Sequence, residues 1–330
     1  MLLNIIIRSV GAYHPETSLS NEYFLKHFHD QGKDIDHFLT HMGRESRYMI
    51  QSDEENGLTM GTEAAKDALA QANLIGEDID MIVFSTQVPE YTFPTNATFV
   101  HHAIQAKSHT IILDSNANCG GMSVAVEQAC RYMKSNPKVN RTLVVGSDYN
   151  TLLCDPNDEV TYSNYGDAAC AVILEKSETE EGFLGSSYFS ETTETRENII
   201  YPAQGLAKAL RQGKGGRYLK WTPFDGSCAL PPAYHSIQEL LDEQHLSPEE
   251  VKAYCLSQFS LANILEIQKH FNLTNEQIIY IGDRFGYTGT SSPFLALHEG
   301  LQEGRIKRGD YVIFWTVGAG LQTIGMLFKY

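Results

Sequence analysis

The chain has 330 residues, of which 42% are hydrophobic, and its formal net charge is −16. This length allows one large core or two medium ones, and the acidic balance argues against general binding to nucleic acid or anionic membranes. The six cysteines show no Cys-x-x-Cys spacing, which is typical of a reduced chain without a structural zinc site. We therefore expect a cytoplasmic protein that binds neither nucleic acid nor membrane and holds no metal.

The first segment, residues 1–8, is apolar and carries no run of basic residues. We interpret it as a first strand and not as a signal peptide. Residues 64–84 then have the pattern of a helix, a turn and a strand, in that order. No apolar run approaches the length that spans a membrane.

The most informative segment is residues 111–129, where an apolar strand leads through a glycine turn into a helix that begins near Cys119. A helix N-terminus carries unpaired N–H groups and a partial positive charge, and both stabilise a thiolate over a thiol. The same N–H groups can hold the oxyanion that forms when sulfur attacks a thioester. The alternative is a small buried core cysteine. The flanking Asn118 and Gly120-Gly121 favour the nucleophile.

The middle of the chain has less regular patterning. Residues 142–146 form an apolar strand, and residues 165–174 form a glycine turn that leads into another. Residues 185–235 are rich in Ser, Thr and Gly without a clear period, which predicts connecting and lid-forming loops. Within them lies a stretch of five cations and no acid, which is either a solvated loop or a docking site for an acidic partner. Its cations are Lys208, Arg211, Lys214, Arg217 and Lys220.

The last third of the chain repeats the pattern of the first. Residues 236–256 again have the pattern of a helix, a turn and a strand, as residues 64–84 do. Residues 278–283 then resemble the strand before Cys119, and this correspondence places Thr288 opposite the cysteine. Each half is predicted to be a mixed α/β unit with strands buried on both faces.

These observations predict three parts. They are an N-terminal half with the nucleophile at residues 1–175, connecting and lid loops at residues 176–235, and a C-terminal half at residues 236–330. Two such halves are expected to pack as one layered body in which helix N-termini meet near a pseudo-dyad.

Several short motifs carry a resemblance to a known family. They are Asp114-x4-Cys-Gly-Gly121, Tyr165-Gly-Asp-Ala168, Asp283-Arg-Phe-Gly286, Gly304-Arg-Ile-Lys-Arg-Gly-Asp310, Gly318-Ala-Gly320 and Thr92-Phe-Pro94. Together they resemble the thiolase superfamily and, within it, β-ketoacyl-acyl-carrier-protein synthase III, along the whole chain. The resemblance implies an αβαβα layered fold, built from two duplicated halves and assembled as a homodimer.

The same resemblance implies roles for individual residues. Cys119 is the acyl-accepting nucleophile, and its N–H and that of Gly320 form the oxyanion hole. Phe93 reaches into the partner subunit's acyl pocket. The acyl donor is acyl-CoA or the phosphopantetheine arm of an acyl carrier protein, and no cofactor is tightly bound.

The chain departs from the family at two catalytic positions. The family's His-Gln-Ala-Asn motif corresponds to Ser257-Gln-Phe-Ser260, and its Gly-Asn-Thr-Ser motif corresponds to Gly286-Tyr-Thr-Gly289. The catalytic set therefore becomes Cys119, Ser257 and Tyr287. Losing one oxyanion donor costs on the order of 100- to 1000-fold in rate, so this set disfavours conventional decarboxylative condensation.

Three further departures concern the coenzyme. His37 and His41 correspond to a family tryptophan and a nearby arginine, and Glu159 corresponds to a second arginine that contacts the coenzyme. Replacing phosphate-facing cations by a carboxylate weakens binding of the 3′-phosphate-ADP head. This favours a carrier-protein donor, for which the five cations between residues 208 and 220 are the predicted docking site.

Three functions remain open on the sequence. The first is an acyltransferase that forms acyl-Cys119 and passes the acyl group to an acceptor in fatty-acid, polyketide or secondary-metabolite synthesis. The second is a non-catalytic subunit that pairs, possibly as a heterodimer, with an active ketosynthase-like paralogue. The third is an acyl thioesterase in which water resolves the acyl-enzyme.

Overall fold

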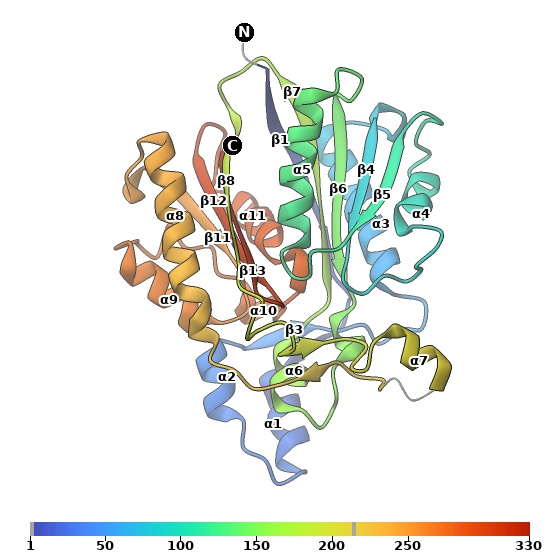
Figure 1. Cartoon of the computed structure of the whole chain (residues 1–330), viewed down its shortest axis with the longest axis vertical. Coiled ribbons are helices and arrows are strands. Elements are labelled where there is room, and N and C mark those ends of the chain that lie inside the picture. The colour runs from blue at the N-terminus through green and yellow to red at the C-terminus, as the bar shows by residue number, and fades with distance from the viewer. Residues whose placement is uncertain (1–2, 213–215) are drawn as a thin grey trace.

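A computed structural model describes residues 3–212 and 216–330 (Figure 1). Two sheets form its framework. Sheet 1 has the strand order β1-β7-β6-β4-β5, and sheet 2 has the order β11-β12-β13-β8. The strands of sheet 1 are β1 (Asn4–Tyr13), β4 (Met81–Ser85), β5 (Ile111–Ser115), β6 (Arg141–Asp148) and β7 (Ala168–Ser177). The strands of sheet 2 are β8 (Gly182–Ser190), β11 (Val251–Leu256), β12 (Tyr311–Gly318) and β13 (Gln322–Lys329).

The pairing of the strands shows the duplication. In sheet 1, β4 is parallel to β6, which is antiparallel to β7, which is antiparallel to β1. In sheet 2 the pattern is the same: β11 is parallel to β12, which is antiparallel to β13, which is antiparallel to β8. The predicted thiolase-like α/β architecture of two related halves is therefore confirmed.

The structure differs from the sequence-based expectation within both sheets. β8 lies in the segment expected to consist of loops, yet it forms the edge of sheet 2. The strand expected at residues 278–283 is reduced to a bridge between Ile278 and Tyr254, and residues Gly282–Phe285 form a short helix, α10. Alternation of apolar residues alone could not show either, because both depend on pairing with distant strands.

Helices separate and cover the sheets (Figure 1). The middle layer contains α5 (Gly121–Ser135) and α11 (Ser292–Gln302), which both contact strands of each sheet. Because α5 lies between two sheets, most of its residues are buried, including the polar Ser123 and Glu127. The outer helices are α3 (Gly57–Ala72) and α4 (Asn96–Ala103) on sheet 1, and α8 (Leu230–Gln244) and α9 (Leu261–His270) on sheet 2.

Smaller elements gather at one end of the layers, the lower end in Figure 1. They are β2 (Ser18–Ser20), α1 (Asn21–His29), α2 (Asp36–Met42), β3 (Ser46–Tyr48), α6 (Glu159–Asn164), β9 (Ile199–Ile200), α7 (Leu206–Gln212) and β10 (Lys220–Trp221). We call this group the cap. Within the described residues, no helix is both long and apolar enough to cross a membrane.

Candidate active site

Cys119 lies in the turn between β5 and α5. Asn118 adopts a left-handed conformation with φ of 54°, and its side-chain Nδ2 donates to the Ala319 carbonyl at 2.9 Å. Gly120 is the N-cap of α5, so the helix begins directly after the cysteine. The predicted placement of Cys119 at a helix N-terminus is therefore correct, and only 9% of the residue is exposed.

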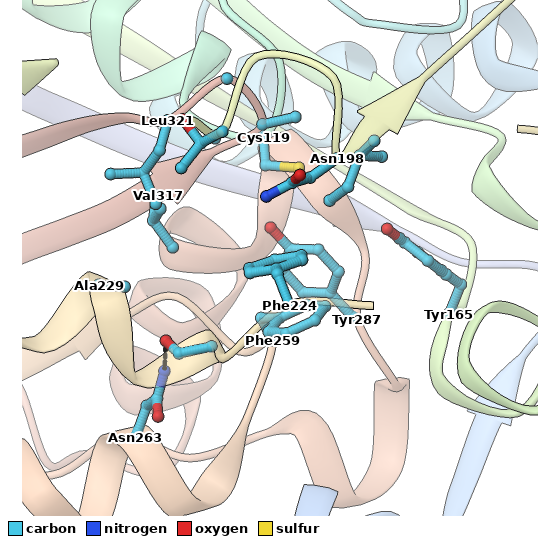
Figure 2. Close-up of a pocket in the computed structure, with 16 residues that line it drawn as sticks. Cys119, Tyr165, Asn198, Phe224, Ala229, Phe259, Asn263, Tyr287, Val317 and Leu321 are labelled. Atoms are coloured by element: carbon cyan, nitrogen blue, oxygen red, sulfur yellow. Dashed lines mark hydrogen bonds between the residues drawn. The ribbon is translucent and has the colours of Figure 1, made fainter. Parts of the chain in front are cut away.

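A narrow cavity of about 60 Å³ opens beside the sulfur (Figure 2). Aromatic rings of Tyr165, Phe224, Phe259 and Tyr287 and the aliphatic side chains of Val317 and Leu321 form much of its wall. Cys119 and Gly320, whose N–H groups are the predicted oxyanion hole, line the same cavity. The site therefore combines an apolar lining with a small number of polar groups near one sulfur atom.

Tyr287 is brought next to the nucleophile. Only 2% of it is exposed, and burial raises the pKa of its phenol well above the usual value, with further increases from contact with Cys119. Tyr287 packs with Cys119 in one small cluster of buried side chains, and Figure 2 shows its hydroxyl pointing toward the sulfur. The structure thus places two of the three predicted catalytic residues in contact.

Ser257, the third of them, follows β11 and is 6% exposed. Its hydroxyl is close enough to lower the pKa of Tyr287, yet Ser257 Oγ has no hydrogen-bond partner of good geometry within the described part of the chain. Ser257 is therefore a buried neighbour of Tyr287 that makes no hydrogen bond to another described side chain.

Burial decides the protonation state of Cys119. Desolvation raises the pKa of its thiol, and nearby Asp148 raises it further, whereas contacts with the Tyr287 hydroxyl, the Gln87 side chain and the Ala319 N–H lower it. Together these contacts raise the pKa of the Cys119 thiol above its usual value. The expectation that the helix N-terminus stabilises a thiolate is therefore wrong for the resting protein, because loss of water around the sulfur outweighs the nearby N–H groups.

Three polar residues near the sulfur were missed by the sequence analysis. Gln87 lies just beyond β4, Asp148 ends β6, and Asn150 follows it. The Gln87 side chain lies 3.8 Å from Cys119 Sγ and contacts both other residues. The signal available in the sequence was their position, since carboxyl ends of adjacent parallel strands meet at one edge of a sheet.

Arg44 is a fourth residue that was missed. It is 3% exposed, and its Nη2 donates to the carbonyl oxygens of Gln258 at 2.7 Å and Phe259 at 2.8 Å. Its Nη1 donates to the carbonyl of Gly282 at 3.1 Å. The guanidinium therefore fixes the loop that carries Ser257 to the segment that leads to Tyr287.

A larger cavity of about 610 Å³ continues outward from the narrow one and shares Phe224, Gly226, Phe259 and Asn263 with it. His41 lines it, together with the carboxylates of Asp225 and Glu266, and no lysine or arginine of the described chain does. Glu159 is paired with Lys33 at 3.1 Å, and His37 is exposed outside this lining.

The remaining predicted residues do not converge on the sulfur. Phe93 is 87% exposed and lines neither of these cavities. Four of the predicted docking cations are exposed in the cap and also lie outside both cavities, whereas Lys214 falls outside the described residues. These four are Lys208, Arg211, Arg217 and Lys220.

A five-layered α/β body with a buried cysteine at the start of a middle-layer helix defines a thiolase-like protein. Residues 113–192 match the model of the 3-oxoacyl-[acyl-carrier-protein] synthase III family, and residues 241–330 match the model of its C-terminal region. The two matches together cover more than half of the chain. The protein therefore belongs to the 3-oxoacyl-[acyl-carrier-protein] synthase III family, whose members are acyltransferases.

Individual relatives cover the whole chain at low identity. The β-ketoacyl-[acyl-carrier-protein] synthase III of Aquifex aeolicus is 28% identical over 98% of this chain and 99% of its own length. That of Bartonella henselae is 28% identical over 100% of both chains. A crystal structure of the Aquifex aeolicus enzyme superposes with a TM-score of 0.86 at 26% identity and covers 100% of both chains.

Proposed function

We propose that this protein transfers an acyl group through a thioester on Cys119 to an acceptor in fatty-acid, polyketide or secondary-metabolite synthesis, without conventional decarboxylative condensation. The observation that supports this most directly is the surroundings of the sulfur. A buried thiol at the start of α5 faces a cavity and contacts the Tyr287 hydroxyl, while no histidine lines that cavity.

The first step requires few groups. The Cys119 sulfur attacks the donor's carbonyl carbon, a new S–C bond forms, and the donor's own C–S bond breaks. The thiol proton leaves with the released sulfur, so that the products are acyl-Cys119 and a free thiol. The N–H groups of Cys119 and Gly320 are the proposed donors to the oxyanion of the intermediate.

The second step distinguishes this protein from a condensing enzyme. Decarboxylation of a malonyl thioester leaves an enolate that needs strong donors at its oxygen. Ser257 and Tyr287 are neutral hydroxyls, and burial raises the pKa of Tyr287 so that it is a weak acid. An acceptor that is already nucleophilic needs no such stabilisation, and we therefore propose direct acyl transfer.

We propose an acyl carrier protein as the preferred donor. The outer cavity carries Asp225 and Glu266 and no basic residue of the described chain, which is unfavourable for the phosphates of free CoA. Glu159, which stands where the family has a second coenzyme-contacting arginine, is paired with Lys33. The exposed cations of the cap are the proposed landing surface for the acidic carrier.

We also propose a homodimer. β5 lies at the edge of sheet 1, and Ile111, Ile112 and Leu113 on it are 37%, 38% and 38% exposed. An unpaired apolar edge strand is a pairing surface, and Phe93 would then reach the neighbour's pocket. Sedimentation at micromolar concentration measures this, and a monomer would contradict it.

The decisive experiment is intact-mass analysis after incubation with acyl-CoA or acyl-carrier protein. We expect a covalent acyl adduct on the wild-type protein and none on Cys119→Ala, and faster labelling by the carrier. Rapid loss of the adduct in water alone would favour the thioesterase. A protein that forms no adduct alone, and that forms one only after a ketosynthase-like partner is added, would favour the non-catalytic subunit.

A further inference from the structure

The amide of Gln87 is the polar group beside Cys119 whose role the proposed function leaves unassigned. Its Nε2 lies 3.1 Å from Asp148 Oδ2 and 3.1 Å from Asn150 Oδ1. Both its Nε2 and its Oε1 lie 3.8 Å from Cys119 Sγ. The distances to sulfur alone therefore allow either end of the amide to face the thiol.

The hydrogen bonds of Asp148 decide which end it is. Its carboxylate accepts from Thr86 Oγ1 at 3.0 Å, from the Gln87 backbone N–H at 2.8 Å and from the Thr290 N–H at 2.9 Å. A carboxylate only accepts, so the Gln87 amide must turn its nitrogen toward Asp148.

The nitrogen of a side-chain amide has only two N–H groups. Asp148 and Asn150 accept one each, and none remains for the sulfur. The carbonyl oxygen of Gln87 is thus left to face Cys119, where it accepts the S–H. An N–H donated to Sγ would lower the pKa of the thiol, which is the direction that the Gln87 side chain gives by proximity alone, whereas an S–H donated to Oε1 raises it. We favour the second arrangement, because Asp148 and Asn150 already accept both N–H groups of the amide.

Gly289 leaves the space in which this arrangement fits. It has φ of 65°, and a Cβ there would lie 2.5 Å from Asp148 Oδ2, 2.9 Å from Asn150 Nδ2 and 3.1 Å from Gln87 Nε2. Any side chain at this position would displace the amide or the groups that hold it. Backbone and side chains therefore both contribute to fixing Gln87.

We propose that Gln87 is a further catalytic residue whose carbonyl oxygen accepts the S–H of Cys119, with Asp148 and Asn150 as positioning residues. In the resting protein this bond keeps the sulfur protonated and directs its lone pairs toward the Tyr287 hydroxyl and the cavity. The inference deepens the proposed function and rests on it for its catalytic meaning.

The test measures the pH dependence of Cys119 alkylation by iodoacetamide, followed by peptide mass. Cys228 is exposed, so all proteins carry Cys228→Ser. Gln87→Met keeps the length of the side chain and removes the acceptor. We expect the midpoint of the pH profile to fall by about one unit, which is about tenfold in the thiolate equilibrium. Gln128→Met, on the exposed part of α5, is the matched control and should leave the midpoint unchanged.

Gln87→Glu should move the midpoint of the pH profile in the opposite direction. A carboxylate beside Sγ disfavours the thiolate, so the midpoint should rise. A rise in Gln87→Met would mean that the amide donates to the sulfur, and no shift in either variant would mean that Gln87 does not face it; both results overturn the inference. Alkylation needs no acyl donor, so its outcome is separate from the formation of acyl-Cys119.

Discussion

Ser257 and Tyr287 place two hydroxyl groups near a thiol that burial keeps protonated. The hydroxyl of Ser257 makes no hydrogen bond to another described residue. Ser257 therefore lies close to the nucleophile without being held by another side chain, and it is a suitable position for introducing a catalytic side chain.

Replacing both residues tests whether they set the reaction. Ser257→His with Tyr287→Asn should increase malonyl-carrier decarboxylation at least about tenfold, because each regained oxyanion donor is worth on the order of 100-fold or more in a well-formed site. Carbon dioxide release measures the rate. Ser260→His with Tyr287→Asn is the matched control, since Ser260 lines the outer cavity and not the one at Cys119. A high rate in the wild-type protein would contradict the assignment.

Local sequence was sufficient to place Cys119 and insufficient to predict its protonation. The strand, the glycine turn and the helix are encoded within residues 111–129. The groups that bury the sulfur come from far along the chain, including Tyr165 and Tyr287. Gln87 was missed for the same reason, because its contact with the thiol exists only once β4 and β5 lie side by side.

At the scale of elements, α7 stands out as the most exposed helix of the cap, with no buried residue. Leu206 and Leu210 on it are 56% and 76% exposed, next to the cations Lys208 and Arg211. Apolar side chains between cations are suited to an acidic helical partner, and this combination supports the proposed carrier docking at α7. The sequence predicted the positive charge of this segment, but it predicted a loop where the structure has a helix.

Charge reversal on this element should separate docking from chemistry. Arg211→Glu with Arg217→Glu should slow acylation of Cys119 by an acyl carrier protein, with a rate that also falls as salt rises. Acylation by a small thioester mimic should not change. Lys134→Glu with Lys138→Glu is the matched control, because these exposed cations lie near and beyond the C-terminal end of α5, the end away from Cys119. Equal slowing with both donors would mean that the segment shapes the cavity instead of docking a partner.

At the scale of the whole molecule, two carboxyl groups are buried where the layers meet the cap. Asp148 accepts four hydrogen bonds near the active site, and Asp167 accepts from the N–H groups of Ile50 and Thr151 and from the Thr151 hydroxyl. Burial raises the pKa of each to about 6. The layered architecture followed from the repeat in the sequence, but this burial required the assembled fold.

These two groups predict how stability depends on pH. Each has a folded pKa above the unfolded value of about 3.9, so the folded chain binds more protons between about pH 4 and pH 6. Their contribution to the free energy of unfolding therefore falls as pH rises through this window, by at most about 1.4 kcal/mol per pH unit for each group.

Denaturant unfolding at several pH values measures this dependence. In Asp167→Asn the free energy of unfolding should decrease less steeply between about pH 4 and pH 6 than in the wild type, whatever the effect of the substitution on overall stability. The exposed Asp53→Asn should leave the pH dependence as it is. An identical slope in Asp167→Asn and wild type would show that Asp167 does not titrate in this range.

The sulfur and the Tyr287 ring that points toward it (Figure 2) come from different copies of the duplicated unit. The turn before α5 supplies Cys119, and the corresponding turn before α11 supplies Tyr287 and Gly289. Substitutions in the second turn alter the surroundings of the sulfur without rebuilding the helix that carries it. Evolution can therefore keep an ancestral nucleophile in place and change the reaction that follows by varying one short loop in the other copy.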